Sequence, residues 1–92
     1  MTIEDIRDKI IQIVDLYSVK KVSLIGTHYN GRVEVASIDL IVEFAIDSIS
    51  HFHIDDMKMT LEDIIGKEVD IIHAPVNVSP LIEQKETVLF ER

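Results

Sequence analysis

Apolar residues recur every three or four positions in the first part of the chain. The spacing holds for six residues, Ile3, Ile6, Ile10, Ile13, Val14 and Tyr17. A recurrence of this kind puts the side chains on one face of a helix. Thr2 and Asp5 are placed to cap its first turn, because each can satisfy a backbone N–H group that the helix leaves free. We therefore predict an amphipathic helix over residues 3–17.

Two runs with β-forming composition follow this helix. Residues 22–25 form a short apolar run that ends at Gly26. Residues 32–44 alternate between apolar and polar at first and then become almost continuously apolar, which is typical of a strand. The pair Asn30-Gly31 between the runs is a turn signal. The pattern predicts two strands joined by an antiparallel return.

The middle of the chain predicts a second helix that leads directly into a third strand. Five apolar residues share one face of a helix over residues 52–65: Ile54, Met57, Leu61, Ile64 and Ile65. Gly66 is a helix stop, and residues 69–73 form the next apolar run. A strand, a crossover helix and a second strand make a parallel unit with a right-handed connection.

The last part of the chain predicts one more helix and an edge strand. Ser79 and Pro80 have the composition of a helix cap and first turn, and residues 88–90 have that of a short strand. The order of elements predicts an α/β (α+β) fold, in which helices pack on a small mixed sheet of three to four strands. With 92 residues the chain has enough apolar surface for one core, so we expect a single domain over residues 1–92.

Composition narrows the function classes. The chain contains 17 acidic and 9 basic residues, a net charge of −8, which opposes phosphate binding over long range and disfavours a DNA-binding role. Most acidic domains are acidic for solubility, although the charge would also suit a basic protein partner. Cysteine is absent, which excludes disulfides and thiolate metal sites. Without an apolar stretch of membrane-spanning length or a basic leader, we expect a cytoplasmic protein that is not inserted in a membrane.

Candidate chemistry is concentrated in three segments. Gly26-Thr27 follows the first predicted strand, Ser37-Ile38-Asp39 leads into the second, and Val69-Asp70 lies in the third. Acids two residues apart on a strand point to the same side, and an acid on the neighbouring strand can join them around a metal ion. Taken singly, Asp39 and Asp70 would be turn or surface residues. Within apolar strands, however, a carboxylate is costly unless it faces a cleft or a partner.

With these motifs the chain resembles the minimal nucleotidyltransferases of the DNA polymerase beta superfamily, which are the antitoxin partners of HEPN-type proteins. Members carry Gly-Ser after the first strand, Asp-x-Asp before the second and Val-Asp in the next. The resemblance runs from Val22 to Glu91. It implies the nucleotidyltransferase fold, transfer of AMP from ATP to a helical HEPN partner, and Mg²⁺ as the cofactor. It assigns Asp39 and Asp70 as catalytic, metal-binding acids, and Gly26 and Thr27 as nucleotide-binding residues.

This chain departs from the family pattern at three positions. Thr27 replaces the usual Ser and keeps the hydroxyl, whereas His28 stands where the family often has Arg. Arg32 is the cation available to contact the nucleotide in its place. Ser37 occupies the position of the first acid, and a hydroxyl binds Mg²⁺ far less strongly than a carboxylate. The metal site therefore retains two acids of an expected three.

The sequence leaves several outcomes open. Glu34 or a water molecule could replace the missing acid, the first only if a bulge turned Glu34 to the same side of the strand. The chain could be an active transferase or a degenerate copy, and the loss of one ligand favours the degenerate copy. The alternative is a non-catalytic interaction module that neutralises or scaffolds a partner by binding alone. The acceptor substrate and the homo- or hetero-oligomeric state are not determined by the sequence.

Overall fold

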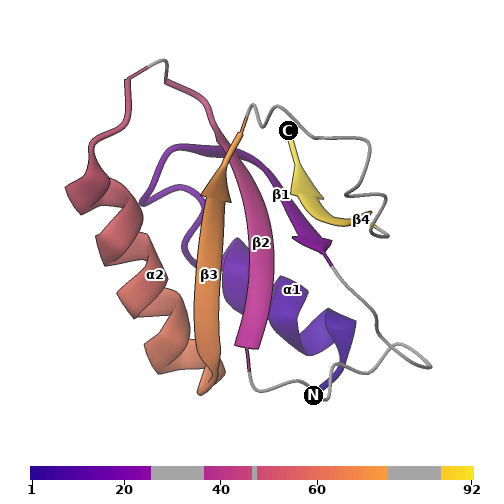
Figure 1. Cartoon of the computed structure of the whole chain (residues 1–92). Coiled ribbons are helices and arrows are strands. Elements are labelled where there is room, and N and C mark those ends of the chain that lie inside the picture. The colour runs from indigo at the N-terminus through magenta and orange to yellow at the C-terminus, as the bar shows by residue number, and fades with distance from the viewer. Residues whose placement is uncertain (26–36, 47, 75–85) are drawn as a thin grey trace, which may run out of the picture.

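Two helices and four strands make up the part of the chain that the structure, a computed structural model, describes: residues 1–25, 37–46, 48–74 and 86–92. In chain order (Figure 1) they are α1 (Ile3–Ile11), β1 (Val19–Ile25), β2 (Ser37–Phe44), α2 (His51–Ile65), β3 (Glu68–His73) and β4 (Glu86–Glu91). The predicted α+β class, with helices on a small mixed sheet, is confirmed. The predicted helix at Ser79 and Pro80, and the residues 32–36 of the predicted second strand, lie outside the described residues.

The four strands form one mixed sheet in the order β3-β2-β1-β4. Strand β1 pairs antiparallel with β2, as the turn signal between them predicted, and antiparallel with β4 on its other side. Strands β2 and β3 are parallel, and the chain passes from one to the other through α2. The predicted parallel unit and the predicted edge strand are therefore both present.

Both helices cover the same face of the sheet, with α1 behind the strands and α2 beside β3 in Figure 1. Alternate residues of β2 are buried against the helices, namely Ile38, Leu40, Val42 and Phe44. They join Ile6 and Ile10 of α1 and Met57, Leu61 and Ile65 of α2 in one apolar cluster. Because side chains alternate along a strand, the remaining residues of β2 lie on the other face of the sheet, which we call the open face because neither described helix packs on it.

Helix α1 is shorter than the sequence predicted. The predicted capping pair is present, since Asp5 N–H donates to Thr2 Oγ1 and Thr2 N–H to Asp5 Oδ2. The helix ends at Ile11 rather than at residue 17, and turns continue to Ser18, which has a φ of 55°. The prediction was wrong because the apolar residues of these turns are buried in the core although they are not helical. Periodicity alone does not distinguish the two cases.

Helix α2 has a defined stop at each end. Ser50 caps its start by accepting a hydrogen bond from the His53 N–H group, and Gly66 ends it in the left-handed conformation with a φ of 78°. Gly66 N–H donates to the Glu62 carbonyl, which satisfies one of the carbonyls left free at a helix end. The predicted helix stop at Gly66 is confirmed. Of the helices that the described residues form, none is long and apolar enough to cross a membrane.

Tyr17 fastens the turn after α1 to α2. Its hydroxyl donates to Asp56 Oδ2 at 2.6 Å and lies 2.8 Å from Thr60 Oγ1. His53 Nε2 is 2.6 Å from the Tyr17 carbonyl oxygen, and the His53 ring packs edge-on against both Tyr17 and Phe44. The turn is thereby held in place by polar contacts as well as by apolar burial.

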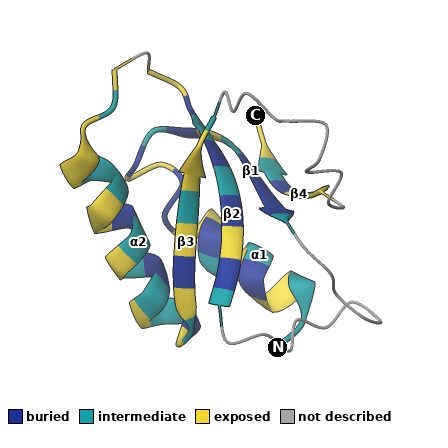
Figure 2. Cartoon of the chain, viewed as in Figure 1, coloured by how far each residue is buried: buried dark blue, intermediate teal, exposed yellow. Residues whose placement is uncertain are grey.

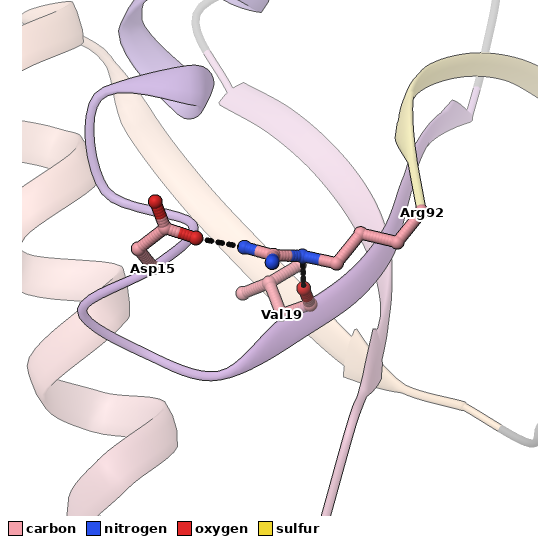
Figure 3. Close-up of polar contacts among 3 residues, drawn as sticks. All are labelled: Asp15, Val19 and Arg92. Atoms are coloured by element: carbon pink, nitrogen blue, oxygen red, sulfur yellow. Dashed lines mark hydrogen bonds and ion pairs between the residues drawn. The ribbon is translucent and has the colours of Figure 1, made fainter.

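Arg92, which follows β4, contacts the same turn and the start of β1 (Figure 3). Its guanidinium forms an ion pair with Asp15, and its Nε donates to the Val19 carbonyl oxygen at 3.0 Å. The guanidinium also lies over the Phe90 ring, 5.4 Å from the ring centroid. These contacts join residues that are 73 and 77 positions apart in the sequence.

Candidate functional site

Asp39 of β2 and Asp70 of β3 are directly opposite each other in the parallel pair of strands. Both are exposed, and both alternate with residues buried against the helices, Ile38 on one strand and Val69 on the other. Alternation places the two carboxylates side by side on the open face of the sheet. The structure thus brings together the two acids that the sequence singled out.

Ser37 lies beside this pair. It is two residues before Asp39 on β2 and opposite Glu68 of β3, and its Oγ donates a hydrogen bond to Asp70 Oδ2 at 3.3 Å. Ser37, which the family resemblance aligns with an acid, therefore belongs to the same cluster and contacts Asp70. An aspartate at this position would place a third carboxylate in the same group.

The environment of Asp39 raises the pKa of its carboxyl above the ordinary value of 3.8. Burial is the largest cause, followed by the negative charge of Asp70 and a side-chain hydrogen bond between the two carboxyls. Both burial and a like charge disfavour the ionised form. Two carboxylates held together in this way are stabilised by a cation, which offsets their repulsion.

The end of β1 is part of the same region. Ile25 is the last residue of β1 and pairs with Asp39 on the side of β2 away from β3. Gly26 and Thr27 follow it in the sequence and so continue the chain from this point. Gly26, Thr27 and Arg32, the predicted nucleotide-binding residues, lie outside the described residues, as does Glu34.

Other acids do not complete the site within the described residues. Glu43, further along β2, forms an ion pair with Lys20 at 3.5 Å. Over the described parts of the chain, no group of three or more His, Cys, Asp or Glu side chains is placed to hold a metal ion. The described site consists of two carboxylates and one hydroxyl. These are oxygen donors with a net negative charge, a set that suits a hard cation such as Mg²⁺.

An apolar row crosses the open face next to the two acids. The strand register aligns one residue from each strand: Ile72, Ile41, Ser23 and Val88. On β2 and β3 this row is two residues further along than the row that contains Asp39 and Asp70. Ser23 is only 1% exposed, and its Oγ has no hydrogen-bond partner among the residues that the structure describes. The sequence analysis missed Ser23. Its place in an apolar strand, one residue before Leu24 and three before Gly26, is the signal that could have identified it.

Comparison with known proteins identifies the fold of this chain. No family model matches the chain. Among solved structures, it is similar to a chain of the tri-AMPylated Shewanella oneidensis HEPN toxin in complex with MNT antitoxin. The identity is 17%, the TM-score is 0.72, and the match covers 98% of this chain and 73% of that one. A toxin-antitoxin crystal structure with AMP-PNP gives a TM-score of 0.68 at 18% identity, with 94% and 73% of the two chains covered. These similarities show the nucleotidyltransferase fold.

A relative closer in sequence shows the family. The chain is 34% identical over 86 residues to a protein of Methanocaldococcus jannaschii whose name assigns it provisionally to the protein adenylyltransferases. The match covers 92% of this chain and 90% of that protein. The chain therefore belongs to the same family as this protein, and its fold is that of the minimal nucleotidyltransferases.

Proposed function

We propose that this chain is the antitoxin of a HEPN-type partner protein, and that it binds ATP with Mg²⁺ at Asp39 and Asp70. The observation that carries the proposal is the pairing of these two carboxylates across β2 and β3 on the open face of the sheet. The raised pKa of Asp39 supports it, because a pair of acids that repel each other is suited to a cation. The chemistry of the donor set fits Mg²⁺.

Each part of the site has a distinct role in this proposal. Asp39 and Asp70 hold the cation, which when bound neutralises phosphate charge and orients the triphosphate. Gly26 and Thr27 bring backbone N–H groups and a hydroxyl to the phosphates, and Arg32 adds a cation. Ile25 supports this arrangement, because its pairing with Asp39 ends β1 beside the acids immediately before Gly26.

The activity we propose is AMP transfer to a hydroxyl group of the partner, at a low rate. The acceptor oxygen forms a bond to the α-phosphorus of ATP, the bond from that phosphorus to the bridging oxygen breaks, pyrophosphate leaves, and the hydroxyl proton passes to solvent or a nearby base. Ser37 lowers the rate in this proposal, because its neutral hydroxyl replaces a metal-binding carboxylate. The acceptor on the partner is left unassigned.

The names of the structural neighbours support the partner and the nucleotide. One neighbour belongs to a complex of an MNT antitoxin with an AMPylated HEPN toxin, and another was crystallised with AMP-PNP, an ATP analogue. The M. jannaschii relative carries the name of a protein adenylyltransferase. Two of these names concern transfer of AMP to a protein, and the third concerns binding of an ATP analogue.

A second candidate function is neutralisation of the partner by binding without AMP transfer. The observation that favours it is the hydrogen bond from Ser37 to Asp70. Asp70 is thereby in contact with a neutral hydroxyl at the position where the family has a third carboxylate. In this case the fold and the partner are the same, and the two candidates differ only in chemistry.

Ligand-dependent thermal stability tests nucleotide binding. A ligand that binds only the folded state raises the melting temperature, by an amount that grows with its concentration over Kd. We expect ATP with Mg²⁺ at millimolar concentration to raise the melting temperature of the wild type, and to have no such effect on Asp39→Asn or Asp70→Asn. Asp8→Asn, which removes an exposed acid of α1, is the matched control and should respond like the wild type. No response in the wild type would overturn nucleotide binding.

A transfer assay then separates the two candidates. The wild type is incubated with a purified HEPN-type protein of the same organism and ATP labelled at the α-phosphorus. Label on the partner that depends on Mg²⁺ and is lost in Asp39→Asn supports transfer. Complex formation without label would instead favour neutralisation by binding alone.

A further inference from the structure

Two large apolar side chains on the outward side of α2 are exposed to solvent. Phe52 is 86% exposed and Met59 is 64% exposed. They are seven residues apart, two turns of helix, and so lie one above the other on the same side. Figure 2 shows this side of α2 as largely exposed along its length. We call the side that contains Phe52, Asp55, Asp56, Met59 and Asp63 the α2 stripe.

The α2 stripe is distinct from the face by which α2 joins the core. Met57, Leu61 and Ile65 are the buried residues of the helix and pack into the apolar cluster under the sheet. Phe52 and Met59 are therefore not needed for core packing. A large apolar side chain in water forgoes the free energy of burial, which a partner that covers it would supply.

The charge around these two side chains is negative. Asp55, Asp56 and Asp63 are all exposed, and they border Phe52 and Met59 on the same side of the helix. Lys58, the one Lys or Arg of α2, is half-buried and follows Asp55 by three residues, so a single cation borders the three acids of the stripe. A second copy of the chain, with a net charge of −8, would be repelled from such a surface, whereas a basic partner would be attracted to it.

We propose that the α2 stripe is the surface by which this chain docks onto its protein partner, and that the partner presents an apolar groove bordered by Lys and Arg. The identification of that partner as a HEPN-type protein rests on the proposed function. Helix α2 packs on the face of the sheet opposite the one that carries Asp39 and Asp70. An acceptor on a partner docked there would lie across the sheet from Asp39 and Asp70, so docking on the stripe fits the second candidate function, neutralisation by binding, better than transfer of AMP to the docked partner.

Affinity measurements on two pairs of matched variants test the docking surface. The probe is the purified HEPN-type protein of the same organism, and Kd is measured by calorimetry with the full chain. Phe52→Ser/Met59→Ser removes the apolar anchors, and we expect Kd to rise at least about tenfold, as for hot-spot residues. Leu16→Ser is the control, because Leu16 is 73% exposed in the turn after α1 and outside the stripe.

The second pair tests charge. Asp63→Lys and Asp8→Lys change the net charge equally, but only Asp63 belongs to the stripe. We expect Asp63→Lys to weaken binding about tenfold and to flatten its dependence on salt, whereas Asp8→Lys should change Kd much less. Asp56 is left intact because it accepts the Tyr17 hydrogen bond. A lysine at position 63 suits the last turn of a helix, so the variant should remain folded.

The possible outcomes separate the docking surface from the proposed function. If the wild type binds the HEPN-type protein and Phe52→Ser/Met59→Ser binds as tightly as Leu16→Ser, the docking surface is overturned and the proposed function stands. If the wild type shows no binding, the partner assignment is overturned together with the docking surface that rests on it. Self-association of the wild type that is lost in Phe52→Ser/Met59→Ser would show that a second copy is the occupant and would also overturn the proposal.

Discussion

Ser37 Oγ donates a hydrogen bond to Asp70 Oδ2 at 3.3 Å, from the strand position two residues before Asp39. The hydroxyl therefore contacts one of the two acids without adding a charge to them. Because Ser37 is on the same face of β2 as Asp39, a carboxylate at position 37 would lie beside the two acids.

Replacing Ser37 with aspartate should increase AMP transfer. The Ser37→Asp side chain would add a third oxygen anion beside Asp70, which strengthens Mg²⁺ binding. We expect transfer to the HEPN-type partner to rise at least about tenfold, the effect of about 1.4 kcal/mol on a barrier. The measurement is the rate of label incorporation from ATP labelled at the α-phosphorus.

Ser37→Asn is the matched control, because it has nearly the shape of aspartate without the charge. Its transfer rate should stay at or below that of the wild type. Equal rates for Ser37→Asp and the wild type would show that position 37 does not limit transfer.

The raised pKa of Asp39 makes this site a source of pH-dependent instability. Between the ordinary value of 3.8 and the raised pKa, the folded chain binds more protons than the unfolded chain, so stability falls as pH rises through that window. Asp39→Asn removes the titration. We expect this variant to melt about 1–3 °C above the wild type at pH 7 without divalent ions, a small effect because Asp39 is exposed. The difference should vanish below about pH 4.

The check is a series of melting curves from pH 3 to pH 8 for the wild type, Asp39→Asn and Asp8→Asn. Asp8→Asn should follow the wild type across the series. A wild type that gained stability over Asp39→Asn as pH rose would contradict the repulsion between Asp39 and Asp70.

Tyr17→Phe should destabilise the fold through the turn after α1. The substitution removes the hydroxyl that donates to Asp56 Oδ2 and contacts Thr60 Oγ1, which should cost about 1 kcal/mol. For a domain of this size the melting temperature should fall by about 4–8 °C. Thermal unfolding at pH 7 measures the loss.

Tyr17 also gives a test at high pH. Burial first, and then the hydrogen bond and charge of Asp56, raise the pKa of the Tyr17 hydroxyl above its ordinary value of 10.0. The wild type should therefore lose stability as pH rises above about 10, because the unfolded chain releases that proton more readily. Tyr17→Phe should lack this loss, and melting temperatures between pH 8 and pH 11 would reveal a gap that narrows as pH rises. A constant gap would contradict the shifted titration.

Gly66→Ala isolates the conformational strain of the helix stop. Gly66 has a φ of 78°, and a Cβ atom added there would meet nothing within 4 Å. The expected loss of about 1 kcal/mol is therefore due to the backbone alone. Gly66→Asn should cost less, since Asn tolerates the left-handed region. Urea unfolding measures both, and equal stability of Gly66→Ala and the wild type would show that the α2 end relaxes without cost.

Much of the fold follows from local pattern. The nearly continuous apolar run that ends at residue 44, the helical period of residues 52–65 and the glycine at 66 predicted β2, α2 and its end, because each signal is local and strong. The end of α1 was missed because Ile13, Val14 and Tyr17 are buried whether the backbone is helical or turned. Strand β1 begins at Val19, earlier than predicted, because its Lys20 and Lys21 do not look like strand residues without their partners Glu43 and Glu91.

The candidate site was predictable only in part. Asp39 and Asp70 are recognisable because a carboxylate within an apolar strand costs free energy unless it faces a cleft or a partner. The predicted parallel unit also makes their two strands neighbours. Their register was not predictable, since it depends on the length of the connection through α2. The contact from Ser37 to Asp70 and the isolated hydroxyl of Ser23 also depend on pairing between strands. The sequence analysis did not identify the α2 stripe, because the exposure of Phe52 depends on how α2 is rotated on the sheet.

The order of strands in the sheet should make backbone amide hydrogens exchange at different rates around Asp39 and around Asp70. Strand β2 is hydrogen-bonded on both sides, to β1 and to β3, whereas β3 is at an edge of the sheet as the described residues form it. Amide hydrogens in edge strands open to solvent at lower free energy than those in central strands. Deuterium should therefore enter the segment around Asp70 well before the segment around Asp39. A ligand that bridges the two acids would slow exchange mainly in β3, and this slowing would report occupancy of the site even in a copy that transfers nothing.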